Sequence, residues 1–93
     1  MQTDKRMNPR VRFERPARIT SSTGEKSSVR SYDFSMQGAG FTGAGPHTVG
    51  ERLSLVVDVG QDGASRILKI HGRVVHQQPM NGGWLIGMQV LKK

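Results

Sequence analysis

The feature that most restricts what this chain can fold into is the alternation of apolar and polar residues between frequent turn residues. The clearest case is segment 53–59, in which every second residue from Leu53 to Val59 is Leu or Val. A period of two is typical of a half-buried β-strand, and no segment has the 3.6-residue period of an amphipathic helix. We therefore predict an all-β protein.

Turn residues divide the chain into about six such segments. Strands are expected at 12–19, 28–32, around Phe41, and at 53–59, 66–76 and 84–91, with turns at 21–26 and 60–65. Pro16 indicates an edge strand, and Gly72 a bend or bulge. The pair Asn81-Gly82 predicts a tight hairpin turn. Short strands with short connections favour an antiparallel barrel or sandwich.

The length and composition limit what such a fold can contain. The 93 residues suit one domain, and with 34% hydrophobic and five aromatic residues its core is modest. No apolar run approaches the roughly 20 residues of a membrane span, and no secretory signal is present. Without cysteine there are neither disulfides nor thiolate sites. We expect a cytoplasmic protein, or a cytoplasmic-facing domain of a larger one.

The charge of the chain favours an anionic ligand. Fourteen Lys and Arg residues against seven Asp and Glu give a net charge of +7, which attracts polyanions. Nine of the fourteen are arginine, and arginine makes planar, two-pronged contacts with phosphate and with the guanine edge. A merely basic, soluble surface is the alternative interpretation.

The first candidate site lies near the N-terminus, where Arg6 and Arg10 are four residues apart. Pro9 disfavours a helix through Asn8, so we predict that residues 1–11 form a flexible basic arm and residues 12–93 the folded domain. On such an arm both guanidinium groups can converge on one ligand, forking to phosphate or stacking on a purine. Alternatively, the pair is solvated.

The second candidate site is the segment Asp33-x-Ser35-x-x-Gly38, which follows a predicted strand. In a purely structural interpretation Asp33 and Ser35 bond local backbone groups, and Gly38 supplies a positive φ. In a functional one, Asp33 accepts hydrogen bonds from N1–H and N2–H of a guanine. The two interpretations are compatible.

Other patterns in the sequence do not indicate chemistry. Segment 38–43 matches G-x-G-x-x-G, but no helix follows it, as a dinucleotide site requires. His71 and His76 are expected on opposite faces of one strand, and His47 in a loop, without a carboxylate cluster. We therefore expect no metal site, no cofactor and no enzymatic activity, because no nucleophile, base and electrophile come together.

Taken together, the two candidate sites resemble the paired motifs of the PilZ domain family, whose members are receptors for cyclic di-GMP. Segments 72–75 (GRVV) and 83–90 (GWLIGMQV) are similar to the late and closing strands of that family. The resemblance covers most of the chain. It implies a six-stranded antiparallel, Greek-key-like β-barrel behind the N-terminal arm.

The resemblance also implies a ligand and its site. Cyclic di-GMP would be gripped by the arm and approached from the barrel by the turn that ends at Gly38. The implied ligand-binding residues are Lys5, Arg6, Arg10, Asp33, Ser35 and Gly38, with Gly40 and Arg73 as further candidates. A basic residue at position 5 resembles members that bind an intercalated pair of ligand molecules. Binding would order the arm and alter a protein partner or a fused domain.

Two other functions remain open. One is a small basic barrel that binds single-stranded nucleic acid, which the net charge of +7 favours and the lack of evident exposed aromatic pairs disfavours. The other is a protein-interaction module without a ligand. Many members of the family continue into a C-terminal helix, whereas this sequence stops at Lys93, directly after the last predicted strand.

Overall fold

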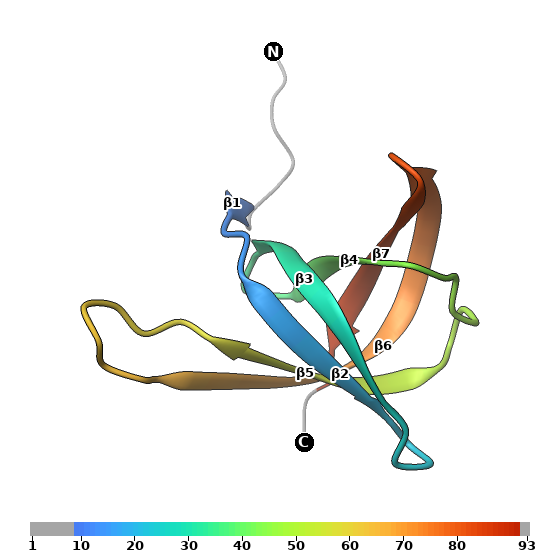
Figure 1. The fold of residues 1–93 in the computed structure, drawn as a ribbon. Coiled ribbons are helices and arrows are strands. Elements are labelled where there is room, and N and C mark those ends of the chain that lie inside the picture. The colour runs from blue at the N-terminus through green and yellow to red at the C-terminus, as the bar shows by residue number, and fades with distance from the viewer. Residues whose placement is uncertain (1–8, 92–93) are drawn as a thin grey trace.

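The computed structural model describes residues 9–91, which form seven strands and no helix (Figure 1). The strands are β1 (Val11–Arg12), β2 (Pro16–Ser21), β3 (Lys26–Phe34), β4 (Gly38–Gly43), β5 (Arg52–Asp58), β6 (Ile67–Met80) and β7 (Gly83–Val90). The predicted all-β class is confirmed. Within the described range, no helix could cross a membrane.

Six of the strands close into an antiparallel barrel, which decides between the predicted barrel and sandwich. Around the ring the order is β2, β3, β4, β7, β6 and β5, and β5 pairs again with β2. The hairpin between β5 and β6 projects from the wall of this barrel (Figure 1). Each of the six strands pairs with two neighbours, but the two ends of β6 pair on one side only, residues 67–71 with β5 and residues 74–80 with β7.

The predicted strand 12–19 is interrupted, and its two parts, β1 and β2, both pair with β3. Ser31, a buried residue only 1% exposed, bonds the backbone at this interruption: its hydroxyl accepts the N–H of Arg15 at 2.9 Å and donates to the carbonyl of Phe13. Pro16 begins β2, which lies between β3 and β5, so the edge-strand prediction was wrong. Proline fits because pairing with β5 begins only at Ala17.

Strand β6 carries an irregularity, but not at the expected residue. The register with β7 shifts between Val74 and His76, so Val75 is the bulge residue. Gly72 pairs regularly, and it is needed because a Cβ there would lie 2.7 Å from the carbonyl oxygen of Gln89. The extra residue turns His76 to the outer face that His71 also occupies. The prediction of opposite faces was therefore wrong.

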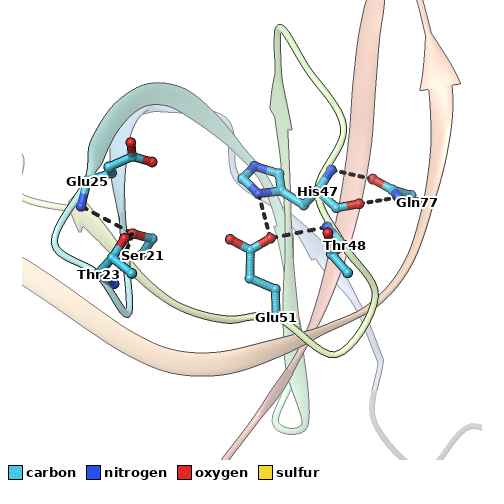
Figure 2. A network of polar contacts seen from close by, with 7 residues as sticks. All are labelled: Ser21, Thr23, Glu25, His47, Thr48, Glu51 and Gln77. Carbon is cyan, nitrogen blue, oxygen red and sulfur yellow. Dashed lines mark hydrogen bonds and ion pairs between the residues drawn. The ribbon is translucent and has the colours of Figure 1, made fainter.

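The turns follow local sequence signals. Asn81 and Gly82 both have positive φ, 46° and 82°, as the predicted tight turn between β6 and β7 requires. In the turn between β2 and β3, the hydroxyl of Ser21 accepts the N–H groups of Thr23 and Glu25 (Figure 2).

The core is formed by inward-facing residues of β2 and of β4 to β7. Its buried members are Ile19, Ala39, Phe41, Leu53, Leu55, Val57, Val74, Ile86 and Met88.

The loop 44–51 between β4 and β5 is tied to this core. The ring of His47 meets Phe41 edge-on, and the side-chain amide of Gln77 bonds both the N–H and the carbonyl of His47 (Figure 2). The Glu51 carboxylate accepts the N–H of Thr48.

Candidate functional site

The centre of the site is a pair formed by Arg10 and Asp33. The guanidinium donates from Nε to Oδ2 and from Nη2 to Oδ1, both at 3.0 Å. Antiparallel pairing positions the two residues, because Arg12 lies opposite Asp33 and Arg10 is two residues upstream. The hydrogen bonds to Asp33 raise the pKa of Arg10 above its usual value. The structure thus joins one residue from each predicted motif.

A floor of two glycines lies beside this pair. Pairing across β3, β4, β7 and β6 places Asp33, Gly40, Gly87 and His76 in one row. The neighbours of these glycines within β4 and β7 are buried core residues, so the glycines face outward. A Cβ on Gly40 would lie 2.6 Å from Asp33 Oδ1, and one on Gly87 would overlap His76. Both side chains therefore lean over the floor.

This row forms a pocket of about 260 Å³ on the outer wall of the barrel. The pocket is open to solvent on the side that faces away from the barrel, and its base is flat because it consists of glycine backbone. The lining residues are Arg10, Asp33, Gly40, His76, Leu85, Ile86 and Gly87.

The turn after Asp33 has a structural role. The hydroxyl of Ser35 accepts the N–H groups of Gln37 and Gly38 at 3.3 and 3.2 Å, and the backbone N–H of Ser35 donates to the carbonyl of Gly38 at 2.9 Å. The structural interpretation of Ser35 is thereby confirmed. The positive φ predicted for Gly38 was wrong. Glycine is required instead because a Cβ would overlap the carbonyl oxygen of Met88 on β7.

The remaining predicted site residues are placed as follows. Lys5 and Arg6 lie outside the described residues. Gly40 joins the pocket as its floor under Asp33. Arg73 is exposed on β6 opposite Gln89 and does not line the pocket.

Sequence reasoning missed His76, Leu85 and Gly87 as pocket residues. The spacing of His76 within its strand pointed to the wrong face, since a bulge at Val75 cannot be read from an alternating pattern. Only the pairing of Gly87 with both Gly40 and His76 reveals the floor.

A second, larger depression of about 440 Å³ shares no lining residue with this pocket and includes Tyr32 and Trp84 in its lining. The guanidinium of Arg12 lies 3.9 Å from the centre of the Tyr32 ring and also bonds Glu14. One face of Tyr32 is therefore covered by protein. Within residues 9–91, no three His, Cys, Asp or Glu residues come close enough to hold a metal ion.

Comparison with known proteins supports one family. The family model named PilZ domain matches residues 4–92. No curated protein matches the sequence significantly.

Solved structures share the fold at low sequence identity. The inhibitor of motility MotI/DgrA from Bacillus subtilis matches with a TM-score of 0.78 at 17% identity, over 97% of this chain and 44% of that one. The PilZ domain of YcgR from Escherichia coli, solved with c-di-GMP, gives 0.73 at 17%, over 95% and 79%. The PilZ domain of CeSA from a cellulose-synthesizing bacterium gives 0.67 at 17%, over 91% and 83%. The chain thus spans less than half of MotI/DgrA.

Proposed function

This chain belongs to the PilZ domain family, and we propose from that premise that it is a non-enzymatic receptor domain for cyclic di-GMP. The observation that carries the proposal is the pair of 3.0 Å hydrogen bonds between Arg10 and Asp33 at the edge of the glycine-floored pocket. The YcgR domain, a structural neighbour, was solved with c-di-GMP.

The Arg10–Asp33 pair is suited to the ligand without being broken. Arginine has five N–H donors, and Asp33 uses two of them, so three remain for a phosphate or for the O6 and N7 acceptors of guanine. Each carboxylate oxygen of Asp33 also keeps a lone pair for the N1–H and N2–H of a guanine. Their pairing holds both groups in position before the ligand arrives, which lowers the ordering cost of binding.

The arm completes the site in this proposal. Arg6 and Lys5 approach the ligand from the opposite side, and the arm becomes ordered over it. Ordering a residue costs about 1–2 kcal/mol of backbone entropy. Charged hydrogen bonds and base stacking must offset that cost, so losing one arginine should prevent binding. The ordered arm then presents a new surface to a protein partner or a fused domain in the cytoplasm.

Isothermal titration calorimetry with cyclic di-GMP tests the proposal and also reports whether one molecule or an intercalated pair binds. We expect saturable binding by the unsubstituted chain and none by Arg10→Ala. Arg18→Ala, which removes an exposed arginine of β2 outside the pocket, should bind like the parent.

The two alternatives predict different titrations. Strongly salt-dependent binding of oligonucleotides without a response to cyclic di-GMP would indicate a nucleic-acid-binding barrel. An inert titration with both ligands would indicate an interaction module.

A further inference from the structure

The imidazole of His76 lies flat against the barrel wall. Of the His76 ring atoms, Nε2 would be the closest to a Cβ built on Gly87. This Cβ would lie 2.5 Å from Cε1 and 3.0 Å from Cδ2 of the same ring. If the ring pointed at Gly87 with its edge, both carbons would lie clearly farther away than Nε2. The similar distances instead put the face of the ring, near its Nε2–Cε1 edge, over Gly87.

The opposite face of the ring is available to a ligand. His76 is exposed while Gly87 beneath it is buried, and the residue lines the same pocket as Arg10 and Asp33. The bulge at Val75 creates this orientation, since it turns His76 outward beside Gly87 while Gln77 pairs with the buried Ile86. A flat aromatic ring supported on one face and open on the other is a stacking platform.

We infer that His76 is a base-stacking residue of the ligand site, and that its outer face packs against a guanine of cyclic di-GMP. The inference rests on the proposed function and extends it to a residue outside both sequence motifs. Asp33 and His76 lean over the glycine floor from its two ends. A nucleotide in this pocket would therefore meet a carboxylate for its base edge and a ring for its base face.

The chemistry of stacking makes the inference specific. A purine stacks on any flat aromatic ring, so the plane of His76 matters and its N–H donor does not. Stacking contributes about 1–3 kcal/mol per base, equivalent to a roughly five- to hundredfold change in affinity.

Titration of three His76 variants of the full chain with cyclic di-GMP distinguishes the role of the flat ring from that of its N–H donor. His76→Ala removes both, His76→Asn keeps a donor, and His76→Phe keeps the plane. We expect Ala and Asn to weaken binding roughly five- to hundredfold, and Phe to remain within about threefold of the parent. His71→Ala is the matched control, because His71 lies on the same strand, bonds Ser54 and does not line this pocket.

A fourth variant tests the support of the ring instead of the ring itself. Gly87→Ala would push the imidazole off the floor, and we expect it to weaken binding while thermal unfolding shows the domain still folded.

The outcomes distinguish this inference from the proposed function. If the parent binds, Arg10→Ala does not, and His76→Ala binds like the parent, only the stacking inference is wrong. If Asn retains binding and Phe loses it, the ring acts as a hydrogen-bond donor and stacking is again wrong. If the parent itself does not bind cyclic di-GMP, the proposed function fails and the inference fails with it.

Discussion

Arg10 and Asp33, 23 residues apart in sequence, face each other through two hydrogen bonds of 3.0 Å. Arg10 keeps 44% of its side-chain surface exposed and Asp33 only 16%. The carboxylate is thus anchored in the wall while the arginine remains accessible. Because the arginine side of the pair is this exposed, the pair contributes little to stability. In the proposed function its role is to hold both groups in position for the ligand.

The planar, two-pronged guanidinium group of Arg10 is predicted to contribute to ligand affinity beyond its positive charge. Arg10→Lys keeps the charge but offers a single ammonium group that cannot bond both oxygens of Asp33 and a ligand in one plane. We expect cyclic di-GMP affinity to fall roughly ten- to a hundredfold, the value of one or two charged hydrogen bonds. Calorimetry measures this directly. Parent-like affinity of the lysine variant would show that charge alone suffices.

A substitution at Gly40 should weaken ligand binding while leaving the stability of the fold unchanged. A methyl group in Gly40→Ala would lie 2.6 Å from Asp33 Oδ1 and push the carboxylate away from Arg10. The moved atom belongs to a side chain, so we expect the melting temperature to stay near that of the parent while affinity for cyclic di-GMP drops about tenfold or more. Gly45→Ala, with no atom within 4 Å of the added carbon, is the control and should change neither.

Ser31 is predicted to be the most sensitive polar residue for folding. Its hydroxyl bonds the backbone of both Phe13 and Arg15 in the break between β1 and β2. Ser31→Ala leaves these two backbone groups without a partner in a partly buried place and should lower the free energy of unfolding, measured with urea, by about 1–3 kcal/mol. Ser28→Ala, exposed on the same strand, should cost less than about 0.5 kcal/mol. Equal effects of the two would contradict this role.

Asp58 should make the β5–β6 hairpin sensitive to acid. Its carboxylate accepts the N–H groups of Gly60 and Arg66 and the hydroxyl of Ser65, and the backbone bonds hold its pKa below 3.8. A lowered pKa stabilises the fold at pH values above 3.8, and this stabilisation is lost as the pH falls through the folded value.

Asp58→Asn should therefore melt below the parent at neutral pH, with the difference shrinking toward pH 3. Asp62→Asn removes the same charge from the same turn without these hydrogen bonds, and asparagine tolerates its φ of 56°. A difference between the Asp58 variant and the parent that stays constant with pH would refute the assignment.

The fold class could be predicted from the sequence because its signals are local. Alternation in segment 53–59 reports one buried face, and Asn81-Gly82 reports a turn with positive φ at two consecutive residues. The resemblance to the PilZ family, carried by the motifs Arg6-x-x-x-Arg10 and Asp33-x-Ser35-x-x-Gly38, is confirmed by the match over residues 4–92.

Tertiary structure alone decided how these elements combine, because strand register and closure depend on residues far apart in sequence. Pro16 lies inside the ring and not at its edge only because β5 returns to pair with β2.

In the sequence, Arg10 and Asp33 belong to two separate motifs. The pocket beside them also depends on strand pairing between distant residues. His76 faces this pocket because one extra residue at Val75 reverses the alternation of β6. Gly40 and Gly87 form a floor only because two pairings on opposite sides of β7 fall in the same row.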